Sequence, residues 1–120
     1  MTFVPTPEDR PVILTVPTVG DTSPMGTVLG GWIMTQIDHA AGRAGRAFAG
    51  DCVIRAIREL TFHAPLRAGE DLSVFARVAG TGRTSFKLEL VGFSGERMIV
   101  DAELTMICVD AAGHPRLIAG

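Results

Sequence analysis

Lysines, cysteines and long apolar runs are scarce in this sequence, and each shortage excludes a class of protein. Only one of the 11 basic residues is a lysine, Lys87, and acidic residues outnumber basic ones 13 to 11. Because no Lys/Arg cluster is present, the chain lacks the basic surface that binds nucleic acid. No apolar stretch approaches the ~20 residues needed to cross a membrane, and the N-terminus lacks the charged start and apolar core of a signal peptide. We therefore expect a cytoplasmic protein that binds neither nucleic acid nor membranes.

The two cysteines, Cys52 and Cys108, lie far apart in the sequence and match no metal-ligand spacing. The pattern therefore predicts neither a disulfide framework nor a zinc site. The three histidines show no spacing typical of a metal site or a catalytic triad. We expect no metal and no cofactor.

The composition is that of one folded domain. The chain has 120 residues, 47% of them hydrophobic, and a net charge of −2, which is too apolar and too weakly charged for a disordered chain. A single domain is expected at this length. Residues 1–10 are rich in Pro, Thr and charge and predict a loose N-terminal arm, so the domain itself spans residues 11–120.

One segment, residues 31–49, has the periodicity of a helix. It contains no proline, and its apolar side chains recur every 3.6 residues on one face while polar side chains fall opposite. Gly50 and Asp51 predict the end of the helix. The predicted buried face consists of Ile33, Ile37, Ala40, Ala41, Ala44 and Phe48.

The remaining apolar segments predict five strands. They are residues 12–19 (interrupted by Pro17), 52–62, 72–79, 84–93 and 98–109. Short glycine-containing turns join the last three, which predicts an antiparallel meander. Since the helix and the sheet each have one apolar face to bury, we expect an α+β domain with one long helix on a five-stranded antiparallel sheet. The edges of such a sheet favour dimerisation.

Asp38 is the most informative polar residue of the predicted helix. It lies at the border of the apolar face, near Met34, with Gly42 and Gly45 one and two turns further on. A carboxylate in apolar surroundings is a stronger proton acceptor than one in water, and helix glycines leave a groove for a ligand or another backbone. The same pattern also fits an aspartate that points to water beside glycines that permit helix packing.

The predicted helix is entered through Gly30 and Gly31. Free N–H groups at a helix N-terminus suit an anion or a polarised carbonyl oxygen, although a flexible helix entry explains two glycines equally well. Gly31 and Asp38 are seven residues apart, which is ~10.5 Å of helix and too far for both to act on one carbonyl group. If both are catalytic, they must come from two chains whose helices lie side by side in opposite directions.

A third candidate is the turn that contains Arg83, Thr84 and Ser85. The guanidinium and the two hydroxyl groups could hold a phosphate. A hairpin turn with an exposed arginine is an equally good interpretation.

Four segments carry a more specific signal. They are residues 21–38 (DTSPMGTVLGGWIMTQID), 60–70 (LTFHAPLRAGE), 82–86 (GRTSF) and 109–116 (VDAAGHPR). Together they resemble the YciA-type acyl-CoA hydrolases of the hotdog-fold thioesterase superfamily, and the resemblance covers nearly the whole chain from about Leu14.

This resemblance implies a long helix wrapped by a five-stranded antiparallel sheet, and a homodimer that shares its sites and can assemble into a tetramer or hexamer. It implies hydrolysis of acyl-CoA to free acid and CoA without a metal. Asp38 would act as general base or nucleophile. The backbone amide of Gly30, with Gly31 beside it, would polarise the thioester carbonyl from the other subunit.

The resemblance also implies further contacts. Ser23 stands where relatives commonly have an asparagine that orients water or the thioester, and Arg58-Glu59 replaces an Asp-Ser pair. The implied substrate contacts are Gly42 and Thr61 with Arg83, Thr84 and Ser85, the last three for the phosphates of CoA.

Two other functions remain open at this point. A hotdog-fold hydratase or dehydratase would pair a histidine with an acidic residue, and no histidine precedes the helix. A non-catalytic acyl-CoA-binding or sensing protein would bind the ester without releasing the CoA thiol.

Overall fold

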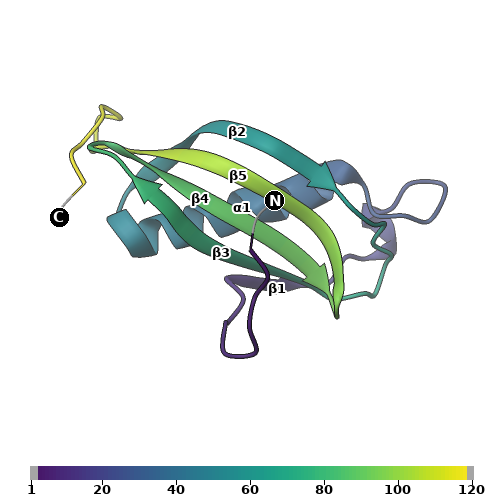
Figure 1. Cartoon of the computed structure of the whole chain (residues 1–120). Helices are drawn as coiled ribbons and strands as arrows, with labels where there is room; N and C mark the ends of the chain where they lie inside the picture. The colour runs from purple at the N-terminus through teal and green to yellow at the C-terminus, as the bar shows by residue number, and fades with distance from the viewer. Residues whose placement is uncertain (1–2, 119–120) are drawn as a thin grey trace.

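The computed structural model describes residues 3–118 as one layer of sheet covered by one helix. In chain order the elements are β1 (Ile13–Thr15), the short 3-10 helix η1 (Val19–Asp21), α1 (Gly30–Ala49), β2 (Cys52–Phe62), β3 (Leu72–Thr81), β4 (Ser85–Ser94) and β5 (Arg97–Cys108). All strand pairs are antiparallel, in the order β1-β3-β4-β5-β2. The helix lies across one face of this sheet (Figure 1). The predicted α+β architecture and the β3–β4–β5 meander are confirmed.

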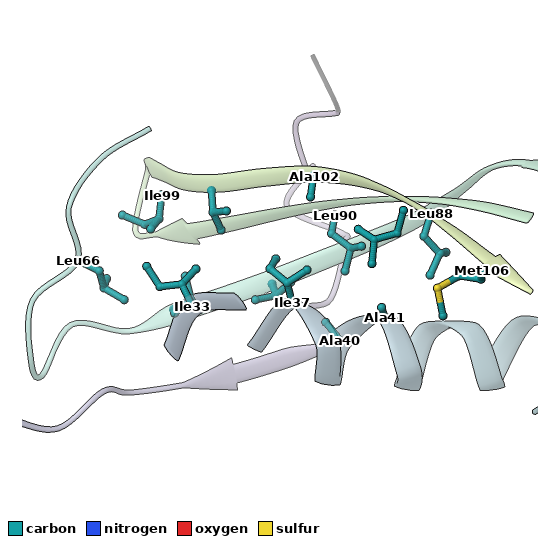
Figure 2. Close-up of a cluster of buried hydrophobic side chains, with 14 of the residues drawn as sticks. Ile33, Ile37, Ala40, Ala41, Leu66, Leu88, Leu90, Ile99, Ala102 and Met106 are labelled. Atoms are coloured by element: carbon teal, nitrogen blue, oxygen red, sulfur yellow. The ribbon is translucent and has the colours of Figure 1, made fainter. Parts of the chain in front are cut away.

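The core lies between α1 and the sheet. Ile33, Ile37, Ala40 and Ala41 point from the helix toward buried side chains of β4 and β5 (Figure 2). These four residues are at most 4% exposed, as the 3.6-residue periodicity predicts. Their burial leaves the other side of the helix, which carries Asp38, facing outward.

Near its C-terminal end the helix departs from the predicted face. Phe48 is 43% exposed and reaches the core only by its ring, whose centroid is 5.0 Å from that of Phe86. Gly45 is buried in its place, and a Cβ atom there would lie 2.5 Å from the sulfur of Cys52. The prediction of Phe48 as a buried residue was wrong, because the glycine lets the helix backbone approach the sheet.

The first strand is also shorter than predicted. It contains three residues, Ile13–Thr15, and ends before Pro17, which cannot donate a hydrogen bond to a neighbouring strand. The strand occupies an edge of the sheet, where a nearby proline is tolerated. Its residues pair with the start of β3.

Both ends of the described chain pack against the sheet or helix. The N-terminal arm crosses the face of the sheet opposite α1 (Figure 1), where the guanidinium carbon of Arg77 lies 4.7 Å from the ring centroid of Phe3. At the other end, Arg116 donates hydrogen bonds to the carbonyl oxygens of Ala49 (2.7 Å) and Asp51 (3.0 Å). The C-terminal tail is thereby tied to the end of the helix. No helix among residues 3–118 is long and apolar enough to cross a membrane.

Candidate active site

The N-terminus of α1 presents free backbone amides. Leu29 is the N-cap in an extended conformation, and its carbonyl oxygen accepts hydrogen bonds from the amides of Trp32 (3.0 Å) and Ile33 (3.3 Å). The amides of Gly30 and Gly31 have no acceptor among residues 3–118, and both glycines are exposed. Two donors with the positive end of the helix dipole behind them suit the oxygen of a polarised carbonyl group.

A short loop holds this helix entry in place. The amide of Leu29 donates to the carbonyl oxygen of Asp21 (2.9 Å), and that of Val28 donates to Leu66 (2.7 Å). Within the loop, the Ser23 hydroxyl accepts a hydrogen bond from the amide of Met25 (3.2 Å) and lies 3.3 Å from the hydroxyl of Thr27. Ser23 therefore closes the turn that leads to the free amides.

The end of β2 packs against the same helix entry. The ring of Phe62 lies 3.4 Å from the position that a Cβ atom would take at Gly30. The next residue, His63, is held by a 2.7 Å hydrogen bond between its Nε2 atom and Asp101 Oδ1. Phe62 thus forms a wall beside the Gly30 amide.

Asp38 lies on the outward side of α1 between two grooves. The groove toward β1 has a volume of about 580 Å³ and the groove toward β2 about 440 Å³, and Asp38 lines both. The carboxylate is exposed in the single chain. It therefore stands where it can reach a molecule that occupies either groove.

The two grooves differ in character. The groove toward β2, called the β2 groove from here on, is mostly apolar and is lined by Met34, Thr35, Ile37, Asp38, Ile54, Ile57 and Leu60. The groove toward β1, the β1 groove, also contains polar and basic side chains, among them Gln36, His39, Arg43 and Arg46. Neither arginine forms an ion pair within the described chain. One groove suits an apolar chain and the other an anionic or polar one.

Of the two helix glycines near Asp38, only one lines a groove. Gly42 lies in the β1 groove, where a Cβ atom would meet only the guanidinium of Arg46. Gly45 faces the core, so the prediction that it lines a groove beside Asp38 was wrong. The sulfur of Cys52 occupies the space that Gly45 leaves.

The other predicted site residues lie away from Asp38 in a single chain. Arg83 and Thr84 precede Phe86, which packs near the C-terminal end of α1, so this turn is at the opposite end of the helix from Gly30. Leu60 and Phe62 both face α1, and alternation along the strand therefore directs Thr61 to the other face of the sheet. No three side chains among His, Cys, Asp and Glu of residues 3–118 are grouped to hold a metal ion.

Comparison with protein families identifies the fold family. The profile of the Thioesterase superfamily matches residues 25–100, which include all of α1 and most of the sheet. The chain belongs to the thioesterase superfamily. The hotdog fold expected from the sequence is confirmed, because the chain superimposes with a TM-score of 0.83 on a hexameric hotdog-fold thioesterase of Campylobacter jejuni. That structure is 27% identical in sequence, and the match covers 92% of this chain and 90% of the other.

Two bacterial acyl-CoA thioester hydrolases show the resemblance in sequence. An uncharacterized acyl-CoA thioester hydrolase of Zymomonas mobilis is 39% identical over 91% of this chain and 78% of its own length. The acyl-CoA thioester hydrolase YciA of Salmonella typhimurium is 27% identical over 92% of this chain and 91% of its own length. The predicted resemblance to YciA-type proteins is thereby confirmed.

The sequence predicted Asp38 and the two glycines as site residues of this thioesterase-superfamily chain, but not the side chains that surround them. Phe62 beside Gly30, and Ile54 and Ile57 in the β2 groove, come from a strand that follows the helix. Alternation in β2 was the available signal for residues 54, 60 and 62, whereas Ile57 reaches the same groove through the irregularities between Ile54 and Ala56 and between Arg58 and Thr61. Which helix residue they meet depends on tertiary packing.

Proposed function

We propose that this protein hydrolyses acyl-CoA thioesters to a free acid and CoA. The observation that carries the proposal is one exposed carboxylate, Asp38, set between two grooves on a helix whose first amides are free. Membership of the thioesterase superfamily and the names of the relatives support it. Because acyl-CoA esters are made and used inside cells, this function agrees with the cytoplasmic location expected from the sequence.

The two reacting groups must come from different subunits. Gly30 and Asp38 are eight residues apart in α1, which is ~12 Å along the helix axis. A carbonyl oxygen held by the Gly30 amide at ~3 Å is therefore out of reach of Asp38 in the same chain. The proposed site combines Asp38 of one subunit with the Gly30 amide of its partner.

The free edge of β2 offers the contact that would bring these groups together. β2 is an 11-residue edge strand, and Val53, Ile57 and Phe62 on it are 45–50% exposed. An uncovered edge of this length is suited to pairing with a second copy of itself. Antiparallel pairing about a twofold axis would place the two α1 helices side by side in opposite directions on one face of a continuous sheet.

Substrate placement follows from the character of the grooves. The acyl chain would lie in the apolar β2 groove, with the thioester at Asp38, and the polar arm of CoA would pass Gly42. The phosphates would be bound by arginine. In an antiparallel pair, Arg83 with Thr84 and Ser85 of one subunit would lie at the same end as Gly30 of the other. Ser23, in the loop that leads to the Gly30 amide, remains a predicted contact of this shared site. Thr61, which alternation directs to the sheet face away from α1, is not placed in it.

The reaction is a hydrolysis whose charge develops on the carbonyl oxygen. Asp38 would accept a proton from water as the water oxygen attacks the carbonyl carbon, and the partner's Gly30 amide would stabilise the oxyanion. When the C–S bond breaks, the sulfur of CoA leaves and takes up a proton. Direct attack by the Asp38 carboxylate, followed by hydrolysis of the anhydride, uses the same two groups.

The minimal unit we propose is the homodimer. The Campylobacter jejuni thioesterase is hexameric, and three such dimers would give a hexamer here. Contacts between dimers could use two other surfaces of the described chain, which are the sheet face that the N-terminal arm crosses and the edge formed by β1.

The function is tested by release of the CoA thiol from short, medium, long and aromatic acyl-CoA esters. We expect Asp38→Asn to lower kcat by ~10²-fold or more, because the amide cannot accept the proton, while circular dichroism and oligomer size stay unchanged. Asp71→Asn, which neutralises an exposed carboxylate in neither groove, should retain wild-type kcat. Wild-type kcat in Asp38→Asn would remove Asp38 from the mechanism. Binding of the esters by the wild-type protein without thiol release would identify an acyl-CoA-binding protein instead.

A further inference from the structure

The two cysteines, distant in sequence, are direct neighbours across the β2–β5 pair. Cys52 and Cys108 are register partners. The amide of Cys108 donates to Thr84 (2.8 Å) and its carbonyl oxygen accepts from Arg116 (2.9 Å), so both backbone groups turn away from β2. The amide of the next residue, Val109, donates to the carbonyl oxygen of Asp51 (3.0 Å). This pattern identifies Cys52 and Cys108 as a non-hydrogen-bonded pair of the antiparallel ladder.

A non-hydrogen-bonded pair brings two side chains as close as a β-sheet allows. The Cα atoms of such a pair are about 4.5 Å apart, and directly opposed side chains share one face of the sheet. Cys108 belongs to the buried core cluster and Cys52 packs against that cluster, so both sulfurs lie on the α1 side. A disulfide needs Cα atoms about 4.4–6.8 Å apart, and the separation typical of a non-hydrogen-bonded pair falls within that range.

The two thiols differ in access. Cys52 is partly exposed, whereas Cys108 is fully buried. The Cys52 sulfur lies against the helix backbone at Gly45, in the space that the missing side chain leaves. A reagent from solution would therefore meet Cys52 first, and Cys108 only through Cys52.

We propose that Cys52 and Cys108 form a reversible disulfide when the protein encounters a low-molecular-weight disulfide. The Cys52 thiolate attacks one sulfur of the reagent, and one thiol leaves, which gives a mixed disulfide at Cys52. The Cys108 thiol then loses its proton and attacks the Cys52 sulfur, and the second thiol leaves. The reagent is reduced to two thiols and the two cysteines are oxidised, so atoms and electrons balance.

The environment of Cys52 sets the rate of this exchange. Desolvation by burial, with Cys108 nearby, raises the pKa of the Cys52 thiol above its ordinary value, and Arg46 and Arg116 oppose that rise. Since only the thiolate attacks, exchange should be slow at neutral pH and faster as the pH rises toward the thiol pKa. A disulfide with one partly exposed sulfur is also the kind that reductants open.

The test is incubation of the folded wild-type protein with glutathione disulfide at several pH values, followed by intact mass and peptide mapping without reduction. We expect a loss of both free thiols, a Cys52–Cys108 cross-link within one chain, and full reversal by dithiothreitol. The midpoint of thermal unfolding should rise by several degrees, because the bond ties an edge strand to the sheet. Circular dichroism of the oxidised protein should be unchanged.

Two variants separate the steps. Cys108→Ala should stop at the glutathione adduct on Cys52, and Cys52→Ala should leave Cys108 unmodified while folded. The proposal is overturned if wild-type protein accumulates the adduct, forms disulfides between chains, or stays fully reduced at a pH where Cys108→Ala reacts. None of these outcomes depends on the proposed enzymatic activity.

Discussion

Glu59 has an unusual backbone conformation for its residue type. Its φ angle is +51°, and among residues 3–118 it is the one non-glycine with positive φ. It sits in β2 at the irregularity between Arg58 and Thr61, where the Thr61 hydroxyl donates to the Glu59 carbonyl oxygen (3.2 Å). Its neighbour Leu60 lines the β2 groove. The bulge therefore shapes the wall beside Asp38, and a residue with a Cβ atom is strained there.

The strain at this position predicts a stabilising substitution. Glu59→Gly should raise the free energy of unfolding by about 1 kcal/mol, because glycine adopts positive φ without a steric penalty. Glu59→Ala keeps the Cβ atom and should give no comparable gain. Urea unfolding at one fixed protein concentration measures both. A Glu59→Gly protein no more stable than Glu59→Ala would show that the backbone there is not strained.

At the scale of elements, α1 is held at both ends by residues distant in sequence. At its C-terminal end, Gly50 takes positive φ and Arg116 donates to Ala49, Asp51 and, through Nε, to the carbonyl oxygen of Val109 (3.1 Å). These carbonyl groups include one that the helix itself leaves unpaired. A cation there also complements the negative end of the helix dipole.

Removal of this cap should destabilise the protein. We expect Arg116→Met to lower the free energy of unfolding by about 2 kcal/mol, since several charge-assisted hydrogen bonds are lost together. The free energy of unfolding of Arg116→Lys should lie between those of the wild-type protein and Arg116→Met, because a single ammonium group cannot reach three carbonyl oxygens as a planar guanidinium does. Urea unfolding gives both values. Equal stability of the wild-type protein and Arg116→Met would contradict a capping role.

How much of each element could be predicted depends on how local its cause is. The extent of α1 follows from its 3.6-residue pattern and from Gly50, and β2 to β5 follow from alternation and turn glycines. Phe48 is exposed because Gly45 lets the helix approach Cys52 of β2. The periodicity of the helix sequence cannot predict this contact with a strand. The same holds for the site. Asp38 and Gly30 were predicted from the sequence, whereas the grooves beside Asp38 form only when the helix packs on the sheet.

At the scale of the whole molecule, the single chain contains half of each proposed site. Gly30 offers a way to remove the amide without removing the helix, because proline is well accepted at the first helical position. Leu29 already has φ −64° and ψ 138°, the conformation favoured before proline. A Cβ atom at residue 30 would lie 3.4 Å from Phe62. Gly30→Ala adds the same Cβ atom but keeps the N–H group, so it is the matched control.

The most direct measurement is the thioesterase activity of mixed oligomers made by co-expressing Asp38→Asn and Gly30→Pro subunits in equal amounts. Each variant alone should be nearly inactive, and Gly30→Ala should stay active. In a mixed dimer one site unites the intact Asp38 of one subunit with the intact Gly30 amide of the other. Random pairing should therefore restore about a quarter of wild-type activity. Mixed oligomers as inactive as the two parent variants would show that the site is not shared between subunits.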